Sequence, residues 1–427
     1  MHESHHTSPH KILIDWIAQE SISFSPVSSE SRHAAIDRII KSHDNRVELL
    51  AFGEPLHGSE EILTLRNHLF QYLVEKYGFR AIAIESSFSR SRIVNEYISG
   101  SGPDSYETIQ DAGFSHGFGC FLPNRDLVEW MRQYNTDPSH VVKLRFYGFD
   151  GPMEMMTTES PRELLFFVLD FLTSVDPKTG QGYRERIRPL LPEDPLWENQ
   201  EAMMDPGKSV GLTPAATALR IETEELITEL WVRRPELVAS SDEPRYLEAM
   251  QYAGMARQLL TYHAGVARNS PSRTSRLLGI RDAMMADILA YIVSVEQDRG
   301  KVLAFAHNSH LKYGKFGWQL GPHLCTWWPA GSHLHHLLGR RYAVIGTGIG
   351  VLESQGIERP EPGTLEDLLL ARPDSGLIIP THPVQGNVPA PIEGLPVRSA
   401  SQKNSTYFPF TSQSMTDFDW VMVLNYE

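Results

Sequence analysis

Cysteine is almost absent from this 427-residue chain, which contains only Cys120 and Cys325. Two cysteines cannot build the disulfide framework of a small secreted domain, so a hydrophobic core must hold the fold together. Long apolar runs are also missing: the best one, residues 164–172, falls well short of the roughly 18 residues that a membrane-spanning helix needs. The first residues have neither the cationic start nor the apolar stretch of a signal peptide. We therefore expect a cytoplasmic protein with no membrane partner.

Positive charge is scarce as well. The chain has 39 Lys and Arg against 53 Asp and Glu, which gives a formal net charge of −14 at pH 7. A surface that follows nucleic-acid phosphates needs the opposite sign, so nucleic acid is not an expected partner. With 41% hydrophobic and 22% charged residues, the composition is typical of a globular protein and excludes a disordered chain.

Short apolar runs rich in β-branched and aromatic residues predict buried strands at 47–52, 81–84, 144–149, 302–306, 342–346 and 420–424. These runs are continuously apolar rather than alternating, so both faces of each strand should be covered. That pattern predicts an α/β fold in which helices flank a mostly parallel central sheet.

In much of the remaining chain, apolar residues recur at the spacing of an amphipathic helix. Residues 61–77 carry it between the first two strands, and residues 153–298 show several helical patterns but no convincing strand. Residues 358–405 are rich in proline and glycine and predict surface loops. We expect a polar N-terminal tail and first helix at 1–25, an α/β catalytic core at 26–152 and 299–427, and a helical insertion at 153–298 that forms a lid over the active-site cleft.

Two catalytic signatures match the sequence without the context that they need. Residues 2–6 fit the zinc-protease pattern H-E-x-x-H, but they lie in a polar tail with no apolar helical stripe. Residues 113–117 fit the nucleophile elbow G-x-S-x-G, but no core strand precedes Ser115 and no helix follows it directly. We predict a frayed terminus for the first and no nucleophile for the second.

Stronger evidence lies where the predicted strands end. The first strand runs into Glu54 and His57, the second into Glu85, the third into Asp150, and the fourth into His307 and His310. Parallel α/β sheets build their sites at the carboxyl ends of their strands. Each residue alone could cap a helix or pack in the core, but together they predict one catalytic site.

These residues also resemble the erythromycin esterase family. The matching blocks run in order from about residue 46 to the C-terminus: Gly53-Glu54-x-x-His57-Gly58, Leu65-Arg66, a strand ending in Glu85, residues 127–135, Tyr147-Gly-Phe-Asp150, Arg281-Asp-x-Met-x-Ala286, Ala306-His-Asn-Ser-His310, Tyr407-Phe-Pro and Phe418-Asp-Trp. Leu56 stands where the family usually has Thr, and Asp287 where it tends to have Asn. The resemblance therefore leaves the identity of the substrate open.

The resemblance implies a metal-independent and cofactor-free hydrolase that opens a macrolactone, with His57 as the general base on water. Glu54, Arg66, Glu85 and His307 match other active-site residues of the family. We assign substrate binding to four further residues, His310, Arg281, Asp150 and Trp318, the last because aromatic side chains near a cleft suit an apolar substrate.

Ester hydrolysis explains why these residue types are needed. Only His has an unperturbed pKa near neutrality, and a carboxylate beside it fixes the tautomer, a role that Glu54 or Glu85 could fill. Arg66 or His307 could stabilise the oxyanion.

Two alternatives stay open. One is a metal-dependent hydrolase, because the same Glu and His side chains offer oxygen and nitrogen ligands. The other is a non-hydrolytic natural-product tailoring enzyme or binding protein that uses the same pocket.

Overall fold

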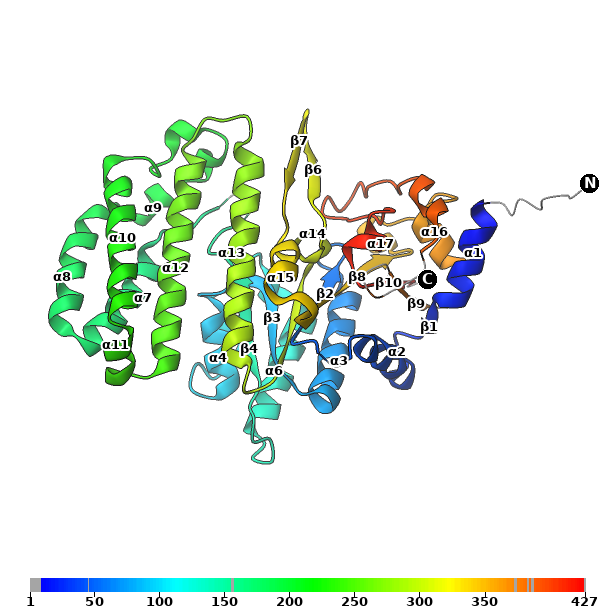
Figure 1. Ribbon diagram of the computed structural model, residues 1–427, viewed down its shortest axis with the longest axis horizontal. Helices are drawn as coiled ribbons and strands as arrows, with labels where there is room; N and C mark the ends of the chain where they lie inside the picture. The colour runs from blue at the N-terminus through cyan, green and yellow to red at the C-terminus, as the bar shows by residue number, and fades with distance from the viewer. Residues whose placement is uncertain are drawn as a thin grey trace, which may run out of the picture.

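The centre of the molecule is an eight-stranded sheet in the order β1-β9-β10-β8-β2-β5-β3-β4 (Figure 1). The computed structural model describes residues 9–425 except 45, 155–156, 372–374, 382–383 and 385–387. Strand β9 runs antiparallel to both of its neighbours, and the other pairs are parallel. The mostly parallel α/β sheet predicted from the sequence is therefore confirmed. Its strands are β1 (Ile22–Phe24), β2 (Leu49–Glu54), β3 (Phe79–Ser87), β4 (Arg145–Asp150), β5 (Lys301–His307), β8 (Tyr342–Ile349), β9 (Gly376–Pro380) and β10 (Trp420–Leu424).

The six predicted strands all form, whereas β1 and β9 of this sheet, and two strands outside it, were missed. Residues 358–405, predicted as loops, contain β9 and the short helix α16 (Leu365–Leu370). Strand β9 pairs with β10 on one side and β1 on the other, so it belongs to the sheet. Its apolar stretch is short and lies between Gly376 and Pro380, two residue types that normally mark a turn.

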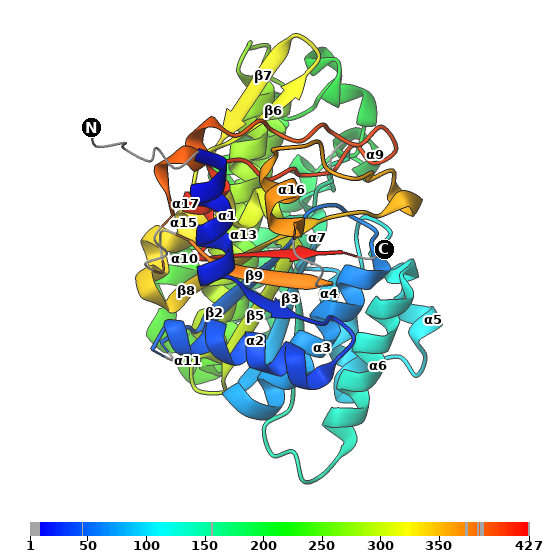
Figure 2. The ribbon, with the colours of Figure 1, turned by 90° about the vertical axis from the view of Figure 1, so that its right-hand side faces the viewer.

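Helices cover both faces of the sheet. The alternation of side chains along β2 separates two apolar clusters, with Leu50 and Phe52 in one and Leu49 and Ala51 in the other. Figure 2 shows the two layers, with α2 and α3 on one side of the sheet and α1 and α16 on the other. The first cluster includes residues of α2 (Ser29–Ser42), α3 (Glu60–Tyr77), α4 (Ser91–Ser99) and α6 (Leu122–Thr136); the second includes residues of α1 (Pro9–Glu20), α13 (Arg273–Glu296), α15 (Ala330–Leu338) and α16.

Between β4 and β5 the described chain forms helices and loops and contributes no strand to the sheet. The helices form the bundle at the left of Figure 1. Helix α13 is the last helix of this stretch, and it packs on β3, β4 and β5. The bundle is therefore continuous with the sheet through α13. Its other helices are α7 (Arg162–Val175), α8 (Pro177–Ile187), α9 (Asp194–Trp197), α10 (Pro214–Val232), α11 (Arg234–Ser240) and α12 (Glu243–Val266).

A two-stranded hairpin of β6 (Phe316–Leu320) and β7 (His323–Trp327) projects from the body beside α13 (Figure 1). It follows β5 through the short helix α14 (Asn308–Leu311). Two other short helices, α5 (Tyr106–Ile109) and α17 (Ser414–Asp417), lie in connecting segments. Among the described helices, none combines the length and the apolar character that a bilayer crossing requires.

Candidate active site

The carboxyl ends of four neighbouring strands bring the predicted polar residues together. Glu54 of β2 and His307 of β5 pair in register, and Glu85 of β3 follows directly after the pair Ile84–Phe305. Asp150, at the end of β4, pairs with Ser87. Because β2, β5, β3 and β4 are adjacent in this order, the four side chains share one edge of the sheet.

His57 and Glu54 form the closest pair at this edge. Nδ1 of His57 lies 2.6 Å from Oε1 of Glu54. Gly58, with φ of 84°, closes the turn after β2, and Ser59 then caps α3 by accepting a hydrogen bond from the Ile62 backbone N–H. The turn leaves the His57 side chain 29% exposed, while that of Glu54 is 3% exposed. The pair thus has one buried end and one end open to solvent.

Burial and neighbouring charges act in opposite directions on this pair. Burial favours neutral His57, but the carboxylates of Glu85 and Glu54 outweigh it and raise the pKa of His57. Burial raises the pKa of Glu54, against the opposing effect of its hydrogen bond to His57. A proton on Nδ1 of His57 is therefore shared with a carboxylate that has little access to water.

Arg66 of α3 is fully buried rather than on the helix surface. Its guanidinium donates to the side-chain oxygens of Asn67 and Asn124, and it stacks over the ring of Phe305 at 4.8 Å. Oε2 of Glu54 is buried and has no hydrogen-bond partner within the described residues. Arg66, Glu54 and Glu85 line a small cavity whose space for water centres is about 10 Å³, roughly the room for one water molecule.

Arg281 connects the helical insertion to the strand ends. Its Nε donates to Asp150 at 3.0 Å, and its Nη2 lies 2.5 Å from Asp150 and 3.1 Å from Glu85. Burial favours the neutral forms of both carboxyls. The neighbouring positive charges outweigh the effect of burial, so the pKa of Asp150 is lowered and that of Glu85 is held well below its usual range.

His310 lies between two carboxylates. Its Nδ1 is 2.8 Å from Oδ1 of Asp282, and its Nε2 is 3.4 Å from Oε1 of Glu85. Burial opposes the charged form, but these carboxylates raise the pKa of His310 to about 10. Asp282 also accepts a hydrogen bond from the indole of Trp327. His310 is therefore a buried imidazolium at neutral pH.

His307 has the opposite character. Its Nε2 lies 2.7 Å from the carbonyl oxygen of Thr406, and its Nδ1 lies 2.6 Å from the Ser309 hydroxyl. A carbonyl only accepts, so Nε2 carries the proton and Nδ1 accepts from Ser309. Burial, helped by the charge of His57, lowers the pKa of His307 to about 3. Neither ring nitrogen of this neutral side chain is free, and its ring packs against His57 at 5.2 Å between centroids.

An open pocket of about 460 Å³ lies in front of His57. Its lining includes residues that the sequence did not single out, from the loop before α6 and the segment after β4. His116 is one of them, and its Nε2 lies 3.1 Å from Oδ2 of Asp150. The lining residues are His57, Gly58, His116, Phe118, Phe121, Glu154 and Thr157.

Ser115 lies in the predicted elbow-like motif and is not exposed as a nucleophile. It is buried, its hydroxyl accepts from the Ser87 backbone N–H, and its own N–H donates to the Ser86 hydroxyl. It fastens the loop to the end of β3. The H-E-x-x-H pattern at residues 2–6 lies outside the described residues.

Trp318 lies on β6 of the hairpin and does not line the pockets at His57. Three residues that sequence reasoning missed form hydrogen bonds with the cluster: His116, Asp282 and Thr406. Asp282 stood in the block with Arg281, and Thr406 precedes the Tyr407 block. His116 follows Ser115 in the pattern at residues 113–117, where the sequence analysis considered only Ser115.

Within the described residues, Glu85, His116 and Asp150 form a group whose potential ligand atoms lie within 4.8 Å of one another. The Arg281 guanidinium already binds both carboxylates of this group. A divalent cation would have to share them with that fixed positive charge, which is unfavourable at short range. We therefore assign no metal to this group.

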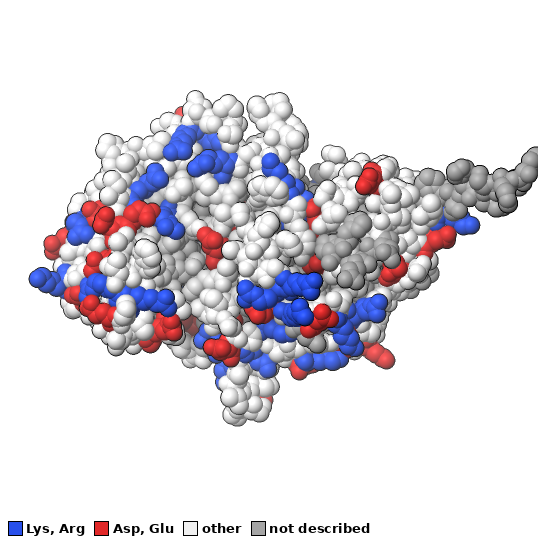
Figure 3. All heavy atoms as spheres, viewed as in Figure 1, with Lys and Arg blue, Asp and Glu red and all other residues white. Residues whose placement is uncertain are grey.

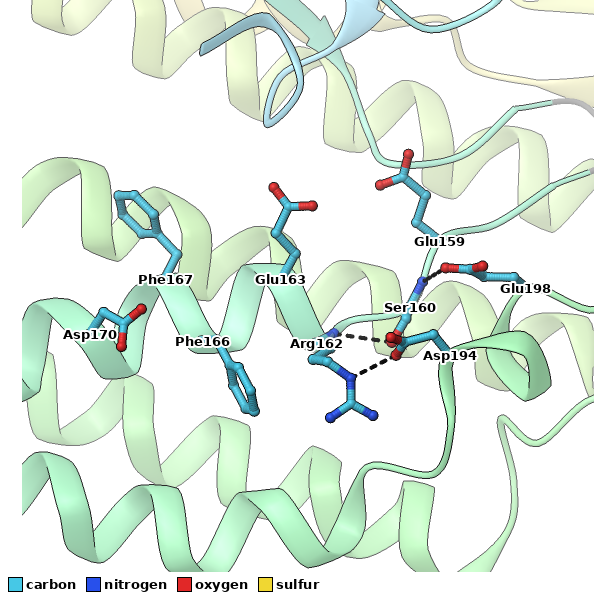
Figure 4. Close-up of a pocket in the computed structure, with 9 residues that line it drawn as sticks. All are labelled: Glu159, Ser160, Arg162, Glu163, Phe166, Phe167, Asp170, Asp194 and Glu198. Carbon is cyan, nitrogen blue, oxygen red and sulfur yellow. Dashed lines mark hydrogen bonds and ion pairs between the residues drawn. The ribbon is translucent and has the colours of Figure 1, made fainter. Parts of the chain in front are cut away.

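A different cavity, of about 430 Å³, lies in the helical insertion (Figure 4). Acidic and aromatic side chains of α7 and its surroundings line it, and several are engaged: Arg162 binds Asp194 at 2.8 Å, and Glu159 binds Arg90. It shares no lining residue with the pockets at His57. The chemistry-bearing residues therefore belong to the strand ends and not to this cavity.

A model of the family described as erythromycin esterase matches residues 74–425. Erythromycin esterase type II of Escherichia coli is 23% identical over 340 residues, which are 78% of this chain and 76% of that protein. Erythromycin esterase type I, also from Escherichia coli, is 23% identical over 286 residues, 64% of each chain. The chain thus spans less than two thirds of this second relative.

Solved structures share the fold. A protein from Bacillus cereus superposes with a TM-score of 0.72 at 16% identity, covering 98% of both chains. A succinoglycan biosynthesis protein gives a TM-score of 0.69 at 17% identity, covering 97% of both. A mutant of the erythromycin esterase EreC in its open conformation gives 0.68 at 16% identity, covering 94% of this chain and 97% of that one.

The family match includes Glu85, Asp150, Arg281 and both buried histidines of the strand-end cluster, but it begins after Glu54, His57 and Arg66. The roles of these last residues therefore depend on the geometry at the end of β2.

Proposed function

This chain belongs to the erythromycin esterase family, and on that premise we propose that it hydrolyses an ester or macrolactone bond with a water molecule that His57 activates. The observation that carries the proposal is the His57–Glu54 pair, with its buried carboxylate and its open end on the wall of a pocket. No metal and no cofactor take part in the proposed reaction.

The hydrogen bond to Glu54 determines which nitrogen of His57 acts. Nδ1–H donates to the carboxylate, so Nε2 presents its lone pair and takes a proton from water as that water attacks the carbonyl carbon. The His57 backbone N–H donates to the Thr406 hydroxyl, and this contact holds the turn in place. His57 is thus oriented from both its ring and its backbone.

The remaining cluster residues set the charge around the reacting atoms. The positive charges of Arg66, Arg281 and His310 accompany the carboxylates Glu54, Glu85, Asp150 and Asp282. A fixed arrangement of charges stabilises a developing oxyanion without reorganising during the reaction. His307, whose ring nitrogens are both occupied, positions His57 and the Thr406 loop.

The substrate that we propose is a small ester or macrolide-like lactone, held between the strand ends and the insertion. Glu154 and Thr157, at the start of the insertion, reach the pocket beside His57, and α13 supplies Arg281. These contacts support the role of the insertion as a lid.

The test is incubation of the purified chain with a panel of macrolactones and simple alkyl esters, read by mass spectrometry for the gain of one water. We expect at least one member to gain water, with equal rates before and after treatment with a chelator. Loss of activity on chelation and recovery on adding a divalent metal would favour the metal-dependent alternative. No gain of water by any member would contradict the proposed function.

A further inference from the structure

We propose that His116 is a second catalytic residue of this site, the general acid that protonates the leaving alcohol when the ester bond breaks. The inference rests on the proposed ester hydrolysis and goes beyond it by naming the group that acts on the other side of the scissile bond from His57.

His116 and Asp150 form a second histidine–carboxylate pair, similar to His57 and Glu54. Its ring is 18% exposed, and its Nε2 lies 3.1 Å from a carboxylate, Asp150, that is fully buried. The other ring nitrogen, Nδ1, makes no hydrogen bond within the described part of the chain. One nitrogen is therefore fixed by a buried carboxylate, and the other is free to meet a substrate.

Both imidazoles open onto the same pocket. His57 and His116 line it together with Phe118, whose ring packs against each of them, with centroids 5.5 Å from His57 and 5.3 Å from His116. A bound ester that covers Phe118 would have one imidazole near the attacking water and the other near the departing oxygen.

The backbone at His116 is strained. Its φ is 58°, in the left-handed region that a residue with a side chain rarely adopts. Neighbouring contacts enforce this conformation: Ser115 is bonded to Ser86 and Ser87, and the His116 backbone N–H donates to Oε1 of Glu154. Strain that the surroundings enforce in this way is typical of functional positions. Here it directs the ring toward Asp150.

The charged groups around His116 come from several elements. Asp150 of β4 and Glu154 of the following segment contact it directly. Behind Asp150 stand Arg281 of α13 and Glu85 of β3. Arg281 helps to keep Asp150 ionised, so its carboxylate is a charged partner for Nε2 of His116.

The proton balance closes with two histidines. His57 removes one proton from water, and the hydroxide adds to the carbonyl carbon. When the tetrahedral intermediate collapses, the bond between the carbonyl carbon and the alkoxide oxygen breaks, and that oxygen takes the proton from Nδ1 of imidazolium His116. The products are the acid and the alcohol. The proton that His57 took from water passes through solvent to His116, which returns both imidazoles to their starting states, and the carboxylic acid product releases its own proton to solvent.

Two classes of ester test this role. A nitrophenolate leaves without needing a proton at neutral pH, whereas an alkoxide does need one. We expect His116→Asn to lower kcat/KM for alkyl esters or lactones by roughly 10²-fold or more, and for nitrophenyl esters by no more than about threefold. Asn tolerates a positive φ, and His116→Gly, which adopts it freely, provides a second variant should the first fail to fold. His140→Asn, in a loop where the ring stacks on Tyr134, is the control.

The outcomes separate the two proposals. A selective loss with poor leaving groups, at a melting temperature within about 3 °C of the wild type, supports the acid role. Equal losses with both ester classes, or undiminished hydrolysis of alkyl esters, overturn it and leave the His57 proposal standing. A wild-type enzyme that hydrolyses neither class overturns both.

Discussion

In the mechanism that we propose, the pairing of Glu54 with His57 makes a histidine on the wall of an open pocket a directed base. A separation of three residues across a tight turn places the two side chains 2.6 Å apart. Oε2 of Glu54, which has no hydrogen-bond partner among the described residues, and the nearby Glu85 add negative charge on the buried side of the ring. Negative charge thus lies on the Nδ1 side of His57, which leaves Nε2 as the reactive atom of the proposed mechanism.

Glu54→Gln tests that polarisation. His57 works as a base only when neutral, so activity falls as the pH drops through its pKa. Glu54 and Glu85 raise that pKa, against burial, and removing the Glu54 charge should lower it. The acid limb of kcat/KM should move to lower pH, and the plateau should drop roughly 10²-fold because the tautomer is no longer fixed.

Glu75→Gln, on the exposed face of α3, is the matched control for this profile and should leave it unchanged. An acid limb that stays at its wild-type position in Glu54→Gln would show that Glu54 does not act on His57.

At the scale of elements, α13 determines how the sheet and the insertion share one site. Consecutive residues of this helix point into the cluster: Arg281 binds Asp150 and Glu85, and Asp282 binds His310 and the Trp327 indole. Strands β3 and β4, the short helix α14 and the hairpin thus converge on one turn of α13.

Arg281→Met should be strongly destabilising. The change leaves two buried carboxylates without their cation, and breaking a buried pair of this kind costs about 3–5 kcal/mol. Urea denaturation of the variant measures the free energy of unfolding. Arg276→Met, on the exposed side of the same helix, should stay within about 0.5 kcal/mol of the wild type. Equal stability of both variants would mean that α13 is held without this pair.

The same scale shows what the sequence could predict. Glu54 and His57 are local neighbours, and the ends of the strands that carry Glu85, Asp150 and His307 follow from the rule for parallel sheets, so these positions were predictable. The pairing of Asp150 with Arg281 joins residues 131 positions apart, and no spacing rule reaches that far. His116 was missed because its role depends on a left-handed backbone that only the surrounding contacts impose.

At the scale of the whole molecule, the net charge of −14 does not gather into one patch on the face in Figure 3, where positive and negative side chains are intermixed. The apolar core, in contrast, extends from the insertion helices to the sheet. One cluster runs from Leu226 of α10 and Leu259 of α12 through Ile288 of α13 to Val302 of β5 and Val344 of β8. The insertion therefore shares its core with the sheet.

That shared core predicts cooperative unfolding. The insertion supplies about half of the helical residues, so its unfolding would remove about half of the far-UV ellipticity, whereas the proposed ester hydrolysis depends on the strand ends. Because one apolar cluster supports both, the two signals should be lost at the same urea concentration. Activity that disappears well before the helices unfold would instead indicate an insertion that is stable independently of the sheet.

The central claim is that His57 activates water. The most direct measurement is kcat/KM for the best ester or lactone substrate with folded His57→Asn beside the wild type. We predict a loss of roughly 10²- to 10⁴-fold, the contribution of a general base, with unchanged far-UV ellipticity. Hydrolysis by folded His57→Asn at the wild-type rate would contradict the account.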